Sequence, residues 1–385
     1  MKIVGIICEY NPLHNGHARQ IRFIRELYGE DCAIVCLMSG NFVQRGQPAM
    51  FHKMIRAEAA LFAGADLVLE LPVQAALSSA EGFAAGGVGI LGTFCDELCF
   101  GSESGDAEGL MNTARALLSP EFSPALHGFL DQGLSFPAAR QRALEQLGTD
   151  AGLLSTPNDI LGVEYCKAIL ATGTSMRPLV ITRQGGYHDT APDRDNPSAT
   201  ALRLCISRGE DIAPYVPEGT APLLANAEIH ALGYGERAML AKLRTMTDEE
   251  FEALPFGSEG LWRKLMHESR RCATVEEIAS AVKSKRYTRT RIDRMILCAF
   301  LGLTAEELNA PAPYTRVLGL TDRGRTALRK AKETGAFYNV GENTRDPYQA
   351  VEHRCADLYA LFAASAPEPA GREQTLRIVY RPLGK

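Results

Sequence analysis

Hydrophobic residues in the first half of the chain form short continuous runs that alternate with amphipathic or alanine-rich segments. The runs cover residues 3–8, 33–38, 66–71, 97–100 and 178–182, and the helix-like segments between them include 17–28, 52–63 and 80–91. Short apolar strands that are bounded by Gly, Asn and Pro and followed by helices are typical of a parallel sheet covered on both faces. The pattern therefore predicts a Rossmann-like, doubly wound α/β domain with ligands at the carboxyl ends of its strands.

The hydrophobic pattern changes after a cluster of Pro and Gly at residues 214–222. The segments beyond this cluster have helical spacing, and they are 225–232, 238–243, 248–254, 261–271, 274–283, 289–301 and 350–363. A short strand-like tail follows at 376–380. A chain of 385 residues is also longer than one typical core. We therefore predict a doubly wound domain at residues 1–213 and a mainly α-helical domain at residues 214–385.

Composition narrows the class of protein. A hydrophobic content of 46% and a charged content of 23% are those of a globular protein, and a net charge of -5 argues against a chain that coats nucleic acid along its whole length. The ten cysteines are scattered and include no paired C-x2-C motif, so we expect free thiols and no metal site. No apolar segment is long enough to span a membrane, and we expect a cytoplasmic location.

Positive charge is nevertheless concentrated in one part of the predicted helical domain. Residues 263–294 contain ten Lys and Arg and four acids. In a chain that is negative overall, such a patch is a candidate contact for a phosphate backbone. On charge alone, a solvated helix face explains it equally well.

The strongest candidate for chemistry is the sequence His14-Asn15-Gly16-His17, where the first predicted strand passes into the first helix. Backbone N–H groups at a helix start bind anions, and Gly16 lets a phosphate approach closely. Two imidazoles fixed there could stabilise the charge that builds when a nucleophile attacks the α-phosphate of ATP. H-x-G-H would arise by chance about 0.015 times in a sequence of this composition, so a catalytic pair is favoured over two surface histidines.

A second helix start, at residues 196–203, has the groups that the far end of a triphosphate needs. Ser198 is a candidate N-cap, Thr200 adds a hydroxyl and Arg203 adds a cation, although simple N-capping explains the segment equally well. Weaker candidates lie in polar loops at the same expected edge of the sheet. They are the loop 39–46, Gly101, Asn158 and Arg183, and Asn158 could contact ATP or merely cap a helix.

Several strings together resemble the bacterial tRNA(Met) cytidine acetate ligase family, which belongs to the HxGH nucleotidyltransferase superfamily. The strings are EYNPLHNGH, MSGNFVQRG, GADLVLELP, FGSE, PNDILGVEY, YHD, KSKRYT and YTRVLGL, and the resemblance runs from Lys2 to about Tyr359. It implies the fold predicted above, catalytic roles for His14 and His17, and an ATP-binding catalytic domain at 1–213. The superfamily commonly has S-S-T-x-x-R in its late phosphate motif, and here Ala199 replaces the second serine.

The ATP-binding residues that we expect combine those implied by the resemblance with the late phosphate motif. They are Ile7, Cys8, Glu9, Tyr10, Asn11, Pro12, Leu13, His14, Asn15, Gly16, His17, Ala18, Arg19, Gln20, Gly101, Asn158, Arg183, Ser198, Thr200 and Arg203. We expect Mg²⁺ to arrive with the nucleotide, because no carboxylate cluster in the sequence forms an evident metal cage.

The activity implied by the resemblance has two steps. Acetate and ATP give acetyl-adenylate and pyrophosphate, and the acetyl group then passes to N4 of the wobble cytidine of elongator tRNA(Met). The helical domain at 214–385 would bind the tRNA, with Tyr287 available to stack on an unpaired base. The tRNA-binding residues that we expect are Lys283, Lys285, Arg286, Tyr287, Arg289, Arg291 and Arg294.

Other functions stay open at this point. A nucleotidyltransferase that adenylylates a small phosphorylated metabolite would leave the basic helical domain without a role. A non-catalytic RNA-binding protein that uses ATP only as a ligand would not need His14 and His17. A class I aminoacyl-tRNA synthetase would need a K-M-S-K-S loop, for which Lys283-Ser284-Lys285 is a poor substitute. The group that takes the N4 proton is also open, with Glu9, His188 and Asp189 as candidates, and no obligate protein partner is evident.

Overall fold

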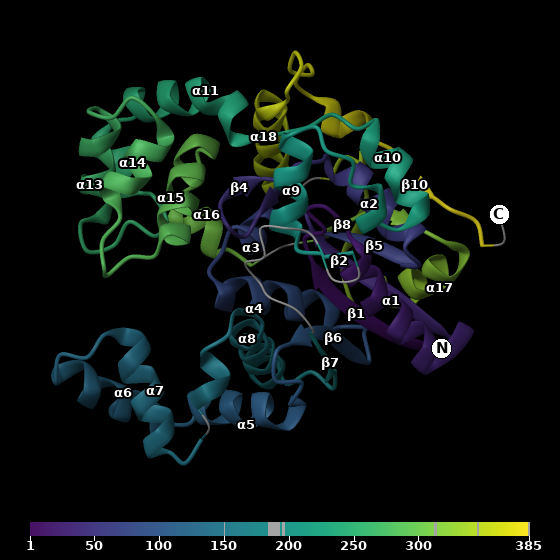
Figure 1. Ribbon diagram of the computed structural model, residues 1–385, viewed down its shortest axis with the longest axis horizontal. Helices are drawn as coiled ribbons and strands as arrows, with labels where there is room; N and C mark the ends of the chain where they lie inside the picture. The colour runs from purple at the N-terminus through teal and green to yellow at the C-terminus, as the bar shows by residue number, and fades with distance from the viewer. Residues whose placement is uncertain (150, 184–192, 195–196, 312–313, 345, 384–385) are drawn as a thin grey trace.

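The computed structural model describes residues 1–385 except 150, 184–192, 195–196, 312–313, 345 and 384–385. Its main sheet has the order β10-β8-β5-β2-β1-β6-β7, with β9 beside β8 (Figure 1). The strands are β1 (Lys2–Cys8), β2 (Cys32–Ser39), β5 (Leu67–Leu71), β6 (Glu97–Ser102), β7 (Arg177–Thr182), β8 (Thr315–Leu320), β9 (Phe337–Asn339) and β10 (Val379–Tyr380). The strands β5, β2, β1, β6 and β7 run parallel to one another, which confirms the predicted doubly wound fold.

Alternate residues of each central strand enter two different cores. Ile3 and Val35 pack on one face of the sheet, and their neighbours Val4 and Ile34 pack on the other. This two-residue period buries the apolar strands on both faces. The first face is covered by α4 (Ala80–Leu91), α5 (Ala107–Leu118), α8 (Pro157–Thr172) and α17 (Asp322–Ala331), and the second by α1 (Asn15–Tyr28) and α2 (Lys53–Phe62).

The sheet also contains three strands from the part of the chain that was predicted to be mainly helical. Strand β8 runs antiparallel to β5, while β9 and β10 run parallel to β8. All six residues of β8 are buried. A short apolar run of this kind does not reveal its partner, because the pairing joins segments that are about 250 residues apart in the sequence. The boundary at 213/214 stays a prediction, and the chain beyond it completes the sheet.

A separate helical core lies beside the sheet domain (Figure 1). It is built mainly from α11 (Leu232–Thr245), α12 (Asp248–Glu252), α13 (Leu261–Ser269), α14 (Val275–Val282), α15 (Arg289–Leu301), α16 (Ala305–Asn309) and α18 (Tyr348–Tyr359). The remaining helices are α3 (Val73–Ala76), α6 (Phe122–Asp131), α7 (Phe136–Gln146), α9 (Ala199–Ser207) and α10 (Ala221–Ala225).

The prediction of a helix at 225–232 is wrong. Helix α10 ends at Ala225 and α11 begins at Leu232. Between them the backbone pairs with the chain that follows α18, since the N–H of Ala231 donates to Phe362 O at 2.9 Å and the N–H of Ala364 donates to Ile229 O at 2.8 Å. These long-range bonds replace the local helical ones.

A small hairpin, β3 (Phe42–Val43) and β4 (Gln47–Pro48), joins the sheet domain to the helical core. Gly46, at its turn, has a φ of +77° and lies against the backbone of α15, where a Cβ would come within 2.5 Å of Arg294 N. The hairpin and α15 therefore form one packed unit, and only glycine fits at their contact.

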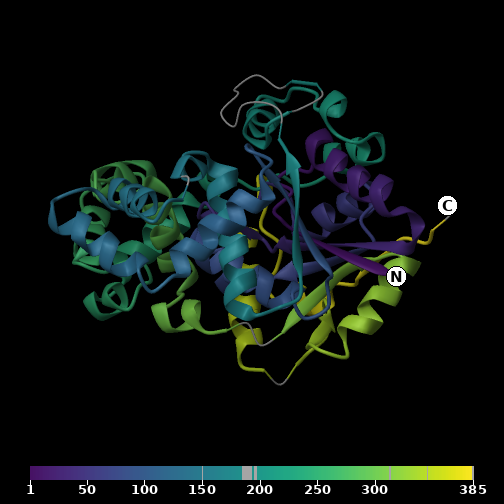
Figure 2. The same ribbon diagram turned by 90° about the horizontal axis from the view of Figure 1, so that it is seen from below.

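The N-terminus and the last described residues of the chain lie on the same side of the molecule in both views (Figures 1 and 2). None of the helices in the described part of the chain combines the length and the apolar character that are needed to cross a bilayer.

Candidate active site

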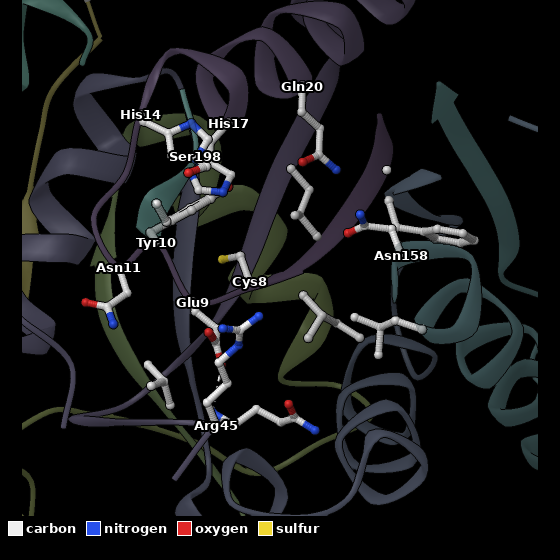
Figure 3. Close-up of a pocket in the computed structure, with 18 of the residues that line it drawn as sticks. Cys8, Glu9, Tyr10, Asn11, His14, His17, Gln20, Arg45, Asn158 and Ser198 are labelled. Carbon is white, nitrogen blue, oxygen red and sulfur yellow. Dashed lines mark hydrogen bonds between the residues drawn. The ribbon is translucent and has the colours of Figure 1, made fainter. Parts of the chain in front are cut away.

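A cavity of about 290 Å³ lies at the carboxyl ends of β1 and β6. From the central strand β1 the chain builds the sheet first toward β2 and β5 and then, on the other side, through β6 and β7. The cavity therefore occupies the topological switch point, where ligands bind in open α/β sheets. The predicted ATP-binding residues that line it are Ile7, Cys8, Glu9, Tyr10, Asn11, His14, His17, Gln20, Gly101, Asn158, Arg183, Ser198, Thr200 and Arg203 (Figure 3).

The rings of His14 and His17 stack against each other at one end of the cavity, with centroids 3.7 Å apart and planes tilted by 21°. His14 is the N-cap residue of α1, and its carbonyl accepts the N–H of His17 at 2.9 Å. The Nδ1 atoms of both rings are buried without a partner in the described structure. The two imidazoles thus stand at a helix start with unused hydrogen-bonding capacity, as a phosphate site requires.

Both histidines are neutral at physiological pH. Burial, with the nearby guanidinium of Arg183 as a further cause, lowers the pKa of His14 to about 3. Burial and the neighbouring His14 ring lower the pKa of His17 well below its usual value. A neutral imidazole still has one N–H donor, so the pair can stabilise developing negative charge through hydrogen bonds rather than through a full positive charge.

Helix α9 brings its N-terminus to the same end of the cavity (Figure 3). Ser198 is its N-cap, and its Oγ accepts the N–H of Ala201 at 3.1 Å. The guanidinium of Arg203 donates to Asn11 O at 2.7 Å and to Thr200 Oγ1 at 3.1 Å. Two helix N-termini and a cation therefore converge beside the histidines.

Asn158 lies across the cavity from His14 (Figure 3), and Arg183 also lines the cavity. Arg183 Nη1 donates to Asn158 Oδ1 at 3.0 Å. The stem of Arg183 lies over Gly101, where a Cβ would be 2.8 Å from Arg183 Cγ. Gly101 therefore makes room for the stem of Arg183. No pattern in the sequence indicated this contact between the two residues.

The hairpin β3–β4 supplies another wall through Val43, Gln44, Arg45 and Gln47. The N–H of Gln44 donates to Glu9 Oε1 at 2.7 Å, and Gln44 O accepts a bond from Arg294 Nη1 at 3.2 Å. Burial raises the pKa of Glu9. Gln44 of the hairpin therefore connects Glu9 in the cavity to Arg294 of the helical core.

Behind this wall, the fully buried Arg56 of α2 holds the strand ends in place. Its guanidinium donates to Glu9 O at 2.6 Å, to Ser39 O at 3.0 Å and to Gly40 O. These bonds join the carboxyl ends of β1 and β2.

The other predicted ATP-binding residues do not line the cavity. Leu13 belongs to the core below α1, Ala18 is buried, and Asn15 Nδ2 donates to Pro214 O at 3.1 Å. Pro12, Gly16 and Arg19 also lie outside the lining. His188 and Asp189 lie outside the described residues.

The apolar lining residues that were not predicted from the sequence include Phe83, Phe100, Leu161 and Tyr165. They lie in or next to apolar segments, where such side chains normally indicate core. Tyr10 and Asn11 are also used structurally, since Tyr10 is 1% exposed and Asn11 Oδ1 accepts the N–H of Met50 at 2.7 Å.

Cys8 is a lining thiol, and burial raises its pKa well above its usual value. It is therefore a protonated thiol and a poor nucleophile. No group of three or more His, Cys, Asp or Glu within the described ranges could hold a metal ion, and Glu9 is the one carboxylate in the described lining.

The predicted tRNA-binding residues gather in the loop before α15 and in its first turns. Lys283, Lys285 and Arg286 are exposed, and Arg286 pairs with Glu259 at 2.7 Å. Arg289 pairs with Glu276 and Asp293, so part of its charge is neutralised. Arg291 donates to Phe256 O and stacks over Tyr287. Arg294 is 7% exposed and faces the hairpin instead of the surface.

Comparisons with known proteins agree with this geometry. Residues 1–374 match the family described as HIGH Nucleotidyl Transferase. The tRNA(Met) cytidine acetate ligase of Clostridium acetobutylicum is 36% identical, with 88% of this chain and 89% of that protein covered. The enzyme of the same name from Acetivibrio thermocellus is 35% identical, with 98% and 100% covered.

Solved structures give the same result. TmcAL from Thermotoga maritima in its apo form superposes with a TM-score of 0.91 at 31% identity, and the match covers 99% of this chain and 100% of that one. A second crystal form of that protein, bound with alpha-thio ATP, superposes with a TM-score of 0.88 at the same identity and coverage.

Proposed function

The chain belongs to the tRNA(Met) cytidine acetate ligase family of HIGH nucleotidyl transferases and is a ligase, and from this premise we propose its reaction. The protein activates acetate with ATP and transfers the acetyl group to N4 of the wobble cytidine of elongator tRNA(Met), giving N4-acetylcytidine. The observation that carries the proposal is the stacked pair His14 and His17 beside two helix N-termini in the cavity.

In the first step, an oxygen of acetate attacks the α-phosphate of ATP, the bond to the β-phosphate breaks, and pyrophosphate leaves. Negative charge grows on the phosphoryl oxygens during this displacement. The imidazoles of His14 and His17 donate hydrogen bonds to these oxygens, and Arg203 supplies a positive charge. No covalent enzyme intermediate is needed, in agreement with the protonated thiol of Cys8.

In the second step, the cytidine N4 attacks the acetyl carbonyl, AMP leaves, and N4 loses a proton. The lone pair of N4 is delocalised into the ring, so the amine must be held against the acyl group where water cannot compete. Phe83, Phe100 and Tyr165 give the cavity apolar walls for this purpose. Glu9, with its raised pKa, is the proton acceptor that the described lining offers.

Mg²⁺ is expected with the nucleotide, to balance the charge of the departing pyrophosphate. The described lining offers it one carboxylate, Glu9, whose Oε1 already accepts the N–H of Gln44. These residues do not form a magnesium cage.

The tRNA is held by Lys283, Lys285, Arg286, Tyr287, Arg289 and Arg291. We leave Arg294 out of this surface because its side chain is buried. The exposed lysines and Arg286 suit phosphate contacts, and Tyr287, whose ring contacts the guanidiniums of Arg286 and Arg291, suits an unpaired base.

One assay tests the proposal against the other two candidates. Purified protein is supplied with ATP, labelled acetate and bulk tRNA, and both labelled tRNA and acetate-dependent pyrophosphate exchange are measured. We expect both signals. Exchange that requires a phosphorylated metabolite in place of acetate would support a metabolite nucleotidyltransferase. ATP and tRNA binding without either signal would support a non-catalytic RNA-binding protein.

A further inference from the structure

Glu103 lies directly behind the cavity wall, in the loop that follows β6. Its Oε1 accepts the backbone N–H of Asn158 at 3.2 Å and the side-chain Nδ2 of Asn158 at 2.5 Å. Its Oε2 accepts the N–H of Asp159 at 2.9 Å. Thr156, at the N-cap position of α8, makes no side-chain cap bond. A carboxylate from another loop therefore takes the place of the missing N-cap.

These contacts fix the orientation of the Asn158 side chain. A carboxylate only accepts hydrogen bonds and a guanidinium only donates them. Asn158 lies between one of each, with Nδ2 toward Glu103 and Oδ1 toward Arg183. Turning the amide over would place its oxygen against the carboxylate and its NH₂ group against the guanidinium, so one orientation is allowed.

The loop that carries Glu103 is itself held firmly. Asp159, 3% exposed, accepts the N–H of Ser104 at 3.1 Å, the hydroxyl of Thr156 at 3.0 Å and the hydroxyl of Ser102. Glu103 is therefore flanked by two residues that are bonded to α8. The backbone of Glu103 is therefore fixed next to α8.

We propose that Glu103 is a positioning residue for the nucleotide, because it holds Asn158 so that the Asn158 carbonyl oxygen and the Arg183 guanidinium face the cavity together. This inference rests on the proposed function, since it takes ATP as the ligand of that wall. The carbonyl oxygen accepts a hydrogen bond from a donor of the nucleotide. That donor is the exocyclic amine of the base or a ribose hydroxyl, whereas the O6 atom of a guanine would oppose it.

The test is to measure ATP binding by calorimetry in the absence of acetate and tRNA. The wild-type full chain is compared with the Glu103→Gln variant. The amide introduced at position 103 has one acceptor oxygen, so it cannot accept from both Asn158 and Asp159. We expect roughly tenfold weaker ATP binding. In the exchange assay, the KM for ATP should rise and the KM for acetate should stay the same. Unchanged ATP affinity in this variant would overturn the inference.

A matched control separates positioning from simple helix capping. Glu277 accepts the N–H groups of Ala273 and Thr274 at the start of α14, away from the cavity. Glu277→Gln should lower the melting temperature by a similar amount and leave ATP binding unchanged. An equal loss of ATP affinity in both variants would mean that Glu103 acts only through stability.

A complementary variant gives a second test. Asn158→Asp places two carboxylates side by side, and we expect it to bind ATP at least as poorly as Glu103→Gln. The double variant that combines Glu103→Gln with Asn158→Asp restores a donor facing an acceptor, since the amide introduced at position 103 can donate to the carboxylate introduced at position 158. Recovery of part of the ATP affinity supports the inference, and a purely additive loss overturns it.

Nucleotide analogues identify the donor. Inosine triphosphate lacks the exocyclic amine, and 2′-deoxy-ATP and 3′-deoxy-ATP each lack one hydroxyl. The donor is the group missing from an analogue that meets two conditions. Wild type binds this analogue more weakly than ATP, and Glu103→Gln binds the analogue and ATP equally well. No weaker binding by any of the three would overturn the acceptor role. A wild type that binds no ATP would instead refute the proposed function.

Discussion

At the scale of single residues, the two neutral histidines make the clearest prediction. His14→Ala or His17→Ala should lower acetate-dependent pyrophosphate exchange by about 10²–10³-fold, because donors to the developing phosphoryl charge are lost. Binding of tRNA should be unchanged in a filter-binding assay. His17→Asn keeps a neutral N–H donor and should keep more activity than His17→Ala. Equal activity of these two His17 variants would count against a hydrogen-bonding role.

His52 makes a second prediction, which concerns pH. Its Nδ1 caps α2 by accepting the N–H of Met54, and burial, with Lys53, Arg56, His230 and Arg372 nearby, lowers its pKa to about 3. The unfolded chain therefore binds this proton more readily, and stability is lost as pH falls from about 6.5 toward 3. His52→Asn keeps a capping oxygen and removes the titration.

The measurement is urea unfolding at pH 7 and at pH 5. The loss of unfolding free energy between these two values should be smaller in His52→Asn by up to about 2 kcal/mol. The same loss in wild type and variant would show that His52 is not a neutral imidazole in the folded protein.

Residue chemistry also explains how much of the candidate site the sequence could reveal. His14, His17, Ser198 and Arg203 were predictable because phosphate binding demands particular groups at helix starts. Phe83 and Tyr165 were not, since an aromatic residue in an apolar helix looks the same whether it faces a core or a cavity. Glu103 belongs to the string FGSE that contributed to the family resemblance. Its contact with Asn158 was not predictable, because it depends on the tertiary approach of the end of β6 to α8.

At the scale of elements, the hairpin β3–β4 is the connection between cavity and helical core. Gly46→Ala would force a Cβ against the α15 backbone and move Gln44. We expect acetyl transfer to tRNA to fall by about tenfold or more while pyrophosphate exchange falls much less. Only the transfer step needs the cavity and the helical core in their correct relative positions. Label from acetate in the tRNA reports the transfer, and label from pyrophosphate in ATP reports the exchange.

The control for this prediction is Gly133→Ala. Gly133 has a similar φ of +85° but no atom within 4 Å of the Cβ position. It therefore adds the same backbone strain, about 1–2 kcal/mol, without the clash. If Gly133→Ala lowers transfer to tRNA as much as Gly46→Ala does, strain rather than the hairpin contact is responsible.

Elements differ in how well the sequence predicts them, and the reason is physical. Helix α15 begins and ends at the predicted residues, because it has an N-cap threonine and a C-terminal glycine. The five parallel strands were found because each apolar run is followed by a helix. Strand β8 and the segment 225–232 depend on pairing with distant chain, and local patterns carry no information on such partners.

At the scale of the whole molecule, net negative charge and one local basic patch should make tRNA binding depend on few contacts. The double variant Lys283→Ala, Lys285→Ala should reduce the slope of log affinity against log salt concentration by between about 1 and 2. The matched control Lys330→Ala, Lys332→Ala removes two exposed lysines on or next to α17, away from the patch (Figure 1). An equal change of this slope in the two double variants would mean that tRNA is held without a defined site.

The closure of the sheet by β8 and β10 has a consequence for biosynthesis. The apolar edge of β5 is formed within the first 71 residues, yet its partner β8 follows more than 240 residues later. While the chain is being translated, that edge is an unpaired hydrophobic template, which invites pairing with other nascent chains. We expect the nascent protein to depend on a chaperone that shields β5 until residue 320 has left the ribosome.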